Sequence, residues 1–104
     1  EINFVFKRAF VVKANRGASR GAHAHKKCYQ LLSCLNGEIS VSCIMKNKKK
    51  YNYKLNKIHQ GLLIEPMTWC VQKYDKNNSI LLVLCDQFFS ENDYIRDYEK
   101  FLSF

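Results

Sequence analysis

Apolar and polar residues alternate in short runs from the start of the chain to about residue 86. Such runs, separated by turn residues, are typical of β-strands that bury one face. The segments predicted as strands are residues 1–12, 28–35, 38–45, 51–55, 62–64, 69–74 and 80–85. Residues 13–20 are expected to form a loop, and Asn36-Gly37 favours a tight hairpin turn. The spacing predicts an all-β protein, either a small sandwich or a barrel.

The C-terminal residues change to the period of a helix. Ser90-Glu-Asn-Asp93 has the form of a capping box, which marks a helix start. The apolar residues that follow are Tyr94, Ile95, Tyr98, Phe101 and Leu102. Their spacing predicts one amphipathic helix that closes the chain and packs its aromatic stripe on the β-strands or on a partner subunit.

Length and composition limit the classes of protein to which the chain can belong. With 104 residues, the chain has room for one domain, residues 1–104. No apolar run approaches the roughly 20 residues of a membrane span, so no membrane partner is expected. The first residues lack the pattern of a signal peptide. The five cysteines include no C-x-x-C pair, which favours reduced, buried thiols in a cytoplasmic protein.

Positive charge is concentrated in the first 60 residues. They contain 13 lysines and arginines and two acidic residues. Residues 61–104 contain four lysines and arginines and seven acidic residues. Six of the lysines lie in residues 46–57, which are expected to be a solvated hairpin loop and its outgoing strand. The basic half suits an anionic partner such as a nucleoside diphosphate. A small nucleic-acid-binding barrel would also fit the charge, but it leaves His23 and His25 unexplained, so no nucleic acid partner is expected.

One segment, residues 20–27, combines several groups that can move protons or bind ligands. On a β-strand, His23 and His25 point to the same face, and Arg20 is near them in the sequence. Gln30 joins that face only if a bulge or a turn resets the register. Imidazoles titrate near pH 6.5, close to where a general base works best. The alternative interpretation is a pair of structural histidines in the core.

The spacing around the two histidines resembles the first motif of cupin proteins. The residues that carry the resemblance are Gly17, His23, His25, Gln30 and Gly37. The usual form of that motif has a glutamate at the place of Gln30. Cupins commonly bind a divalent metal through the two histidines, this glutamate and a third histidine in a second motif.

The second cupin motif would span residues 61–71 here, and Val71 stands at the place of the third histidine. A neutral amide such as Gln30 is a poor replacement for a carboxylate ligand. His59 is expected at the surface. Because two ligands are replaced, we predict no metal and no other cofactor, which leaves the imidazoles free for acid–base chemistry.

A closer resemblance extends over nearly the whole chain. The blocks that carry it are Lys7-Arg8, residues 19–27, Gln30, residues 34–37, residues 61–66 with Trp69, residues 81–84 and residues 93–98. In this order they are similar to the cupin sugar-nucleotide 3,4-ketoisomerases. The resemblance implies a cupin-type jelly-roll barrel with one C-terminal α-helix, a homodimer and no metal. It also implies that the keto group of a dTDP-4-keto-6-deoxyhexose moves from C4 to C3 through an enediol, in deoxysugar synthesis for surface polysaccharides such as lipopolysaccharide.

The same resemblance implies roles for individual residues. His23 matches the catalytic base of the family, His25 its partner in the pocket, and Arg20 an arginine beside them. The substrate-binding residues that it implies are Arg20, Phe10, Tyr29, Gln30 and Trp69. The homodimer is also favoured because the alternating apolar residues of the N-terminal strand offer a sheet edge that needs cover.

The chain departs from the family at Phe10. The family has a tyrosine there, and its phenol lies against the C4 oxygen of the sugar. Tyr29 or a water molecule is expected to take that part. The alternative function is a non-catalytic or altered-specificity cupin that binds a sugar nucleotide. Family members also carry a longer segment before Lys7-Arg8, so the chain is expected to lack the N-terminal segment of the family.

Overall fold

The computed structural model describes residues 5–104, which form two antiparallel β-sheets that face each other. The first sheet has the strand order β1 (Arg8–Ala14), β8 (Ser79–Cys85), β3 (Gln30–Asn36) and β6 (Leu62–Ile64). The second has the order β5 (Lys50–Leu55), β4 (Ile39–Ile44), β7 (Trp69–Tyr74), β2 (Ser19–His25) and β9 (Tyr94–Ile95). A single short helix, α1 (Tyr98–Leu102), follows among the described residues. The prediction of an all-β fold with one C-terminal helix is confirmed.

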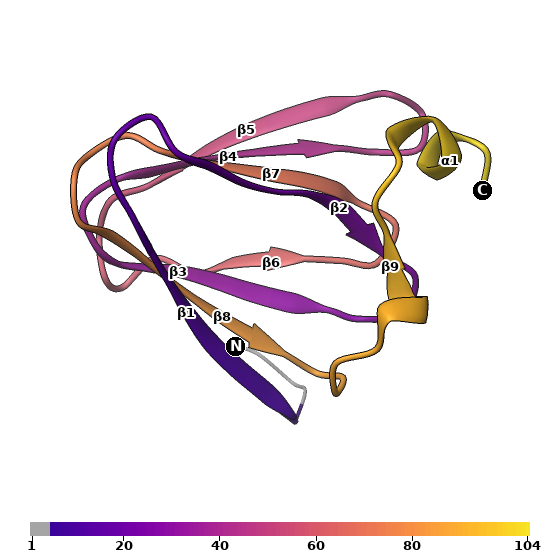
Figure 1. Ribbon diagram of the computed structural model, residues 1–104, viewed down its shortest axis with the longest axis horizontal. Helices are drawn as coiled ribbons and strands as arrows, with labels where there is room; N and C mark the ends of the chain where they lie inside the picture. Colours follow the sequence, from indigo (N-terminus) through magenta and orange to yellow (C-terminus); the bar gives the residue numbers. More distant parts are fainter. Residues whose placement is uncertain (1–4) are drawn as a thin grey trace.

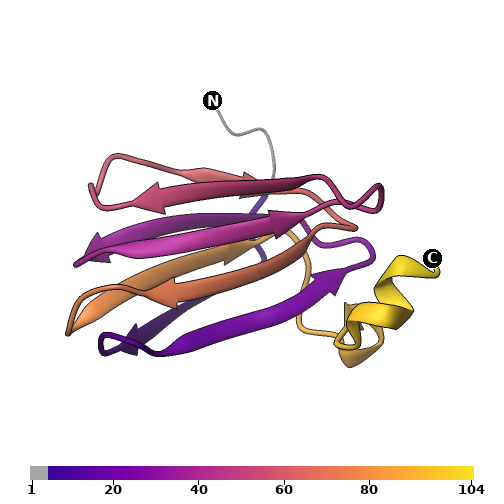
Figure 2. The same ribbon diagram turned by 90° about the horizontal axis from the view of Figure 1, so that it is seen from above.

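The strand order is that of a jelly roll. The chain alternates between the sheets from β1 to β4, passes through the β4–β5 hairpin, and alternates again from β5 to β8. Within residues 5–104 no ladder of hydrogen bonds joins the two sheets, so the jelly roll is a sandwich. Figure 1 shows the sheets close together at one end and apart at the other, where β9 and α1 lie. Figure 2 shows β5, β4, β7 and β2 side by side, with α1 beyond the β2 edge.

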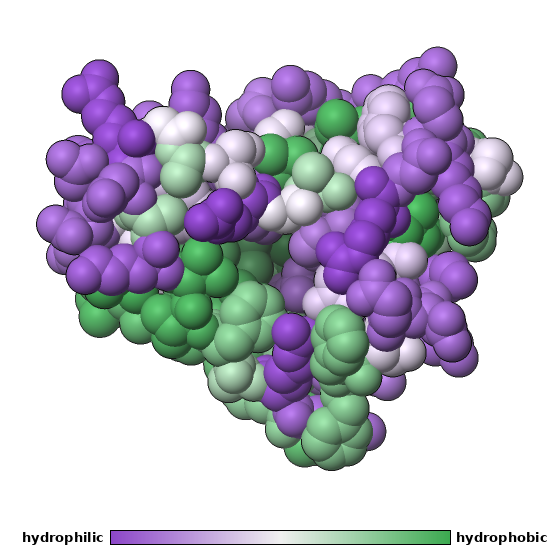
Figure 3. Space-filling model, viewed as in Figure 1, coloured by the Kyte–Doolittle hydropathy of each residue, from purple (hydrophilic) through white to green (hydrophobic). Residues whose placement is uncertain are grey.

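The core lies between the sheets and follows the alternation of the sequence. In β4, Ile39, Val41 and Cys43 are buried, whereas Ser40 and Ser42 face outward and are half-buried. Figure 3 shows apolar side chains gathered over the four-stranded sheet and a hollow near the centre of this face, between the sheets. The five cysteines are all free and buried, which confirms the prediction of buried thiols.

The prediction of a loop over residues 13–20 is wrong at both of its ends. Strand β1 continues to Ala14, and β2 begins at Ser19. The first residues of β2 are small or polar and show no apolar alternation, so their strand conformation depends on pairing with β7. The first strand starts at Arg8, so the prediction of a strand is wrong for residues 5–7, and the predicted strand residues Ile2 and Phe4 lie outside the described residues.

The predicted helix start at Ser90 is also wrong. Ser90 makes no capping bond from its side chain, and residues Glu91–Asp93 form only a single 3-10 turn. Residues Tyr94–Ile95 pair with Ala24 and His25 as strand β9. The carboxylate of Asp93 is bonded to the residues of β2 and the turn after it, so it does not cap a helix.

Helix α1 begins instead at Tyr98, where the Asp97 side chain accepts a hydrogen bond from the backbone N–H of Glu99. Phe101 is fully buried and contacts Trp69 with its ring. The prediction that the aromatic stripe packs on the β-strands is therefore confirmed. No helix within residues 5–104 has the length and apolar character needed to cross a membrane.

Candidate active site

A β-bulge in β2 determines where the site residues point. The pairing between β2 and β7 shifts register between Gly21 and His23. Gly21 has a φ of +90° and Ala22 a φ of +57°, both in the left-handed region. A Cβ atom at Gly21 would lie 2.8 Å from the carbonyl oxygen of Cys70 and 2.9 Å from Oε1 of Gln72. Only glycine fits this position of the bulge.

The bulge places Arg20 and His23 on the same face of the sheet. Arg20 lies opposite Gln72, and His23 lies opposite Cys70; both β7 residues are buried on the core side. Residues directly opposite each other in an antiparallel pair share a face. In a regular strand, residues three apart would face opposite sides. The extra residue therefore places Arg20, which stays exposed, and the half-buried His23 on the inward face of the sheet.

A cavity of about 180 Å³ occupies this space. Its polar lining is Arg20, His23, Gln30, Gln72 and Tyr94, and its apolar side-chain lining is Phe10, Val12, Leu32, Leu81 and Val83. Strands from both sheets contribute to this lining. A concave, mostly apolar site with a few convergent polar groups is the usual setting for a small-molecule ligand.

The imidazole of His23 is held neutral in this cavity. Burial in the protein, helped by the neighbouring His25, lowers the pKa of His23 to about 4. The Nδ1 atom of His23 is buried without a protein partner in hydrogen-bonding geometry. A neutral imidazole at neutral pH has a lone pair that can accept a proton, so His23 has the properties of a general base.

His25 lies beside His23, with the ring centroids 5.1 Å apart, and is oriented by a carboxylate. Its Nδ1 is 2.9 Å from Oδ2 of Asp93, and because an ionised carboxylate only accepts, Nδ1 donates. Oδ1 of Asp93 accepts from the backbone N–H of Lys27 at 2.8 Å, which fixes the carboxylate. Burial lowers the pKa of His25, although the bond to Asp93 opposes this shift.

Tyr94 forms the wall of the cavity next to both histidines. Its ring centroid lies 5.0 Å from that of His23 and 4.3 Å from that of His25. The guanidinium of Arg8 donates to Tyr94 Oη at 3.0 Å, and that of Arg96 lies 4.2 Å above the Tyr94 ring. Tyr94 therefore lines the cavity and contacts two cationic side chains.

The structure brings together some of the predicted site residues and separates others. Arg20, His23, Gln30 and Phe10 line the same cavity, with His25 behind His23. The side chain of Tyr29 is 37% exposed and lies outside the lining. Trp69 also lies outside it, packed in a second apolar cluster that holds α1.

Sequence reasoning missed two of the lining residues, Gln72 and Tyr94. Gln72 lies between Cys70 and Tyr74 on the inward face of a strand that the sequence predicts, and a polar residue at such a position is a signal of a site. Tyr94 was assigned to the predicted helix, which concealed its place on β9.

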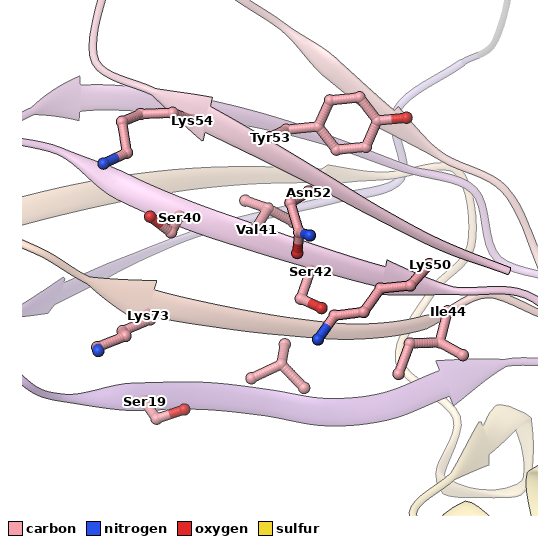
Figure 4. A pocket seen from close by; sticks show the side chains of 11 residues that line it. Ser19, Ser40, Val41, Ser42, Ile44, Lys50, Asn52, Tyr53, Lys54 and Lys73 are labelled. Carbon is pink, nitrogen blue, oxygen red and sulfur yellow. The ribbon is translucent and has the colours of Figure 1, made fainter. Parts of the chain in front are cut away.

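A larger cavity, of about 670 Å³, lies on the outer face of the five-stranded sheet. Figure 4 shows the side chains that line it, among them Ser42 of β4, Lys50 of β5 and Lys73 of β7. It is lined by hydroxyl, amide, amino and aliphatic groups, without an imidazole or a carboxylate. The smaller interior cavity is therefore the better candidate for proton-transfer chemistry.

One group of side chains could in principle hold a metal ion. The ligand atoms of His25, Cys28 and Asp93 lie within 4.8 Å of one another. They already bond within the protein, because His25 donates to Asp93 and the Cys28 thiol donates to the carbonyl oxygen of Tyr29 at 3.3 Å. His25, Cys28 and Asp93 are absent from the lining of the interior cavity. Val71, which stands at the place of the third cupin histidine, lines the cavity on the outer face of the five-stranded sheet. The absence of a metal remains a prediction.

A jelly roll that carries a pair of histidines on β2, directed between its sheets, has the architecture of a cupin. The family model described as "FdtA: WxcM-like, C-terminal" matches residues 1–104. The chain belongs to this family.

Relatives with known activities match over most of the chain. A TDP-4-oxo-6-deoxy-α-D-glucose-3,4-oxoisomerase from Aneurinibacillus thermoaerophilus is 34% identical over 101 residues, which are 96% of this chain and 72% of the relative. The crystal structure of the sugar 3,4-ketoisomerase QdtA from Thermoanaerobacterium thermosaccharolyticum, in complex with TDP, matches with a TM-score of 0.93 and 32% identity, over 98% of this chain and 74% of QdtA. A 3,4-ketoisomerase from Helicobacter canadensis matches with a TM-score of 0.92 and 33% identity, over 98% of this chain and 77% of that enzyme's chain. The resemblance to sugar-nucleotide 3,4-ketoisomerases is confirmed.

Proposed function

We propose that this protein is a 3,4-ketoisomerase that moves the keto group of a TDP-linked 4-keto-6-deoxyhexose from C4 to C3. The observation that carries the proposal is the neutral His23 imidazole in the interior cavity, directed there by the β2 bulge. Family membership and relatives with this activity support the same substrate class.

The cavity holds the groups that such a reaction needs. His23 removes the proton from C3, and the C–H electron pair forms the C3–C4 double bond as negative charge moves to O4. Arg20, a residue that lines the same cavity, stabilises the resulting enediolate. Protonation at O4 gives the enediol. Protonated His23 then gives a proton to C4 while the O3 hydroxyl loses its proton, which leaves the ketone at C3 and restores the neutral imidazole.

The remaining polar residues support the base and hold the sugar. Asp93 fixes the tautomer of His25, which packs against His23. Gln30 and Gln72 line the cavity with amide groups that can both donate and accept, as sugar hydroxyls require. Phe10 supplies an apolar wall. The position of the cavity between the two sheets lets these hydrogen bonds form with less competition from bulk water.

Phe10 also favours a second candidate function. It lines the cavity and carries no hydroxyl where the resemblance implies one. A chain that had lost this phenol but kept the pocket would bind a sugar nucleotide without isomerising it, or would accept a different sugar. The two candidates make opposite predictions for product formation.

We further propose that the protein is a cytoplasmic, metal-independent homodimer in the synthesis of surface polysaccharides such as lipopolysaccharide. The five free thiols are consistent with a reducing compartment. Strand β1 pairs with β8 on one side only and exposes 56% of Val11, so it offers an edge for a partner subunit to cover.

Product analysis tests the proposed function. Wild-type protein incubated with TDP-4-keto-6-deoxyglucose and EDTA is expected to convert it to the 3-keto isomer, detected by NMR spectroscopy. Binding of TDP is measured in parallel by calorimetry. TDP binding without any 3-keto product would support the binding protein instead, and activity that requires a divalent ion would contradict the metal-independent mechanism.

The low pKa of His23 predicts the pH dependence of the reaction. Because the base acts in its neutral form, kcat/KM is expected to stay constant as the pH falls from 7 to about 5 and to decrease as His23 protonates near its pKa of about 4. Between pH 6.5 and 4 the unfolded chain binds more protons at this group than the folded protein, so folding stability also falls. Circular dichroism at each pH separates the two effects. An acidic limb centred near pH 6.5 in folded protein would contradict the assignment.

A further inference from the structure

Among the described residues that line the interior cavity, Tyr94 alone has a hydroxyl group. Isomerisation through an enediol needs a proton at the C4 oxygen when the C3 proton leaves, and His23 is occupied with the carbon-bound proton. We propose that Tyr94 is a catalytic residue that donates its phenolic proton to the C4 oxygen of the sugar. This proposal rests on the proposed 3,4-ketoisomerase function and assigns its second proton donor.

The position of Tyr94 suits a pair of groups that act on adjacent atoms. Its ring lies against His23, with the centroids 5.0 Å apart and the planes at 60°. Both residues line the cavity, one from β9 and the other from β2. A base that reaches C3 and an acid that reaches the oxygen on C4 must approach the sugar from neighbouring points of the wall. His23 and Tyr94 provide such points.

Two cationic side chains contact Tyr94. The guanidinium of Arg8 donates to Tyr94 Oη at 3.0 Å, so one lone pair of the oxygen is occupied and the hydroxyl proton is left to point elsewhere. The bond becomes charge-assisted at both ends when the phenolate forms. Arg96 lies over the ring at 4.2 Å, with its own charge paired to Glu91. Arg8 is therefore the cation in direct contact with the oxygen that gives up the proton.

The surroundings of Arg8 connect Tyr94 with the unusual Phe10. The same guanidinium lies 4.6 Å from the centre of the Phe10 ring, so it contacts both walls of the cavity. Phe10 cannot donate a proton, and Tyr29 lies outside the lining. Tyr94 thus supplies the phenol from the neighbouring wall, which removes the need for Tyr29 or a water molecule in this role.

The proton returns to Tyr94 later in the reaction. When C4 is protonated, the C3 hydroxyl must lose its proton as its oxygen becomes the ketone. The Tyr94 phenolate, formed in the first half of the reaction, accepts this proton and is restored as the phenol. No oxidant, reductant or further reactant is required. His23 takes a proton from C3 and gives one to C4, and Tyr94 gives a proton to O4 and takes one from O3.

Replacement of Tyr94 by phenylalanine tests the proposal, because it removes only the hydroxyl and keeps the ring contacts with the histidines. We expect kcat for TDP-4-keto-6-deoxyglucose to fall about 10²- to 10³-fold, with KM and the Kd for TDP unchanged. Tyr98→Phe is the matched control. Tyr98 follows in the same segment and contacts Trp69 edge to face outside the cavity lining, so this variant is expected to keep the wild-type rate.

A second substitution separates a chemical role from a structural one. Phe10→Tyr, introduced together with Tyr94→Phe, returns a phenol to the cavity beside Arg8 and is expected to recover part of the lost kcat. A wild-type kcat in Tyr94→Phe would overturn the proposal, as would equal losses of kcat and TDP affinity. If the wild type itself binds TDP but forms no 3-keto product, the proposed function fails rather than the assignment of Tyr94 within it.

Discussion

Replacing His23 with asparagine is expected to lower the rate of isomerisation about 10²- to 10⁴-fold, the usual cost of removing a general base. Asparagine keeps a polar side chain of similar reach, but it cannot accept the C3 proton. The cavity is formed by residues from both sheets, so the fold and the affinity for TDP are expected to remain. The rate is measured by NMR detection of the 3-keto product, with the TDP Kd determined by calorimetry.

His25→Asn is the matched comparison for this prediction. His25 contacts the base and is bonded to Asp93, but it does not line the cavity, so its loss affects the orientation of His23 and not the proton transfer itself. We expect a smaller loss of rate than in His23→Asn. A His23→Asn variant with wild-type activity would show that another group is the base, and a larger loss in His25→Asn would reverse the two roles.

Replacing Gly37 with alanine is expected to lower the free energy of unfolding by about 2–5 kcal/mol. Gly37 has a φ of +82°, and this left-handed conformation costs an alanine roughly 1–2 kcal/mol. An added Cβ would also lie 2.9 Å from the Cα of Ser79, a backbone atom in a fully buried residue. Overpacking of this kind adds roughly 1–3 kcal/mol. The turn between β3 and β4 cannot move away easily, because Ser79 Oγ is bonded to both the N–H and the carbonyl oxygen of Glu38.

Gly17→Ala isolates the steric part of this effect. Gly17 has a similar φ of +92°, but nothing lies within 4 Å of an added Cβ. The free energy of unfolding of Gly17→Ala is therefore expected to fall by only roughly 1–2 kcal/mol, the cost of the left-handed conformation for alanine. Urea denaturation followed by circular dichroism gives both values. Equal losses in the two variants would mean that the close approach of Ser79 to Gly37 has no energetic consequence.

Elements with a strong local pattern could be predicted from the sequence. The alternation along residues 38–45 matches β4, because it depends on neighbouring residues. The tight hairpin turn predicted at Asn36-Gly37 is wrong, because β3 and β4 belong to different sheets and Gly37, with its positive φ, lies in a connection between the sheets. Strand β2 could not be predicted in this way. Its strand identity and the bulge at Gly21 depend on β7, some 50 residues further along the chain.

The same distinction applies to the site. His23 and Arg20 stand out in the sequence as a dense group of titratable side chains, and the cavity contains both. Tyr94 could not be placed, because its segment has a helical spacing of apolar residues and forms a strand only through pairing with Ala24 and His25. The bond between Asp93 and His25, 68 residues apart, replaces the capping role that the local sequence favours.

The most direct test of the mechanism is to run the wild-type reaction in deuterium oxide and to locate the incorporated deuterium by NMR. If His23 removes the C3 proton and an enediol forms in the interior cavity, the 3-keto product will carry solvent deuterium at C4, and the recovered 4-keto substrate will carry it at C3. Exchange at C3 at the wild-type rate in the His23→Asn variant would show that another group removes this proton and would contradict the assignment of His23 as the base. The absence of both product and exchange, with TDP still bound, would contradict the assignment of catalysis to this cavity.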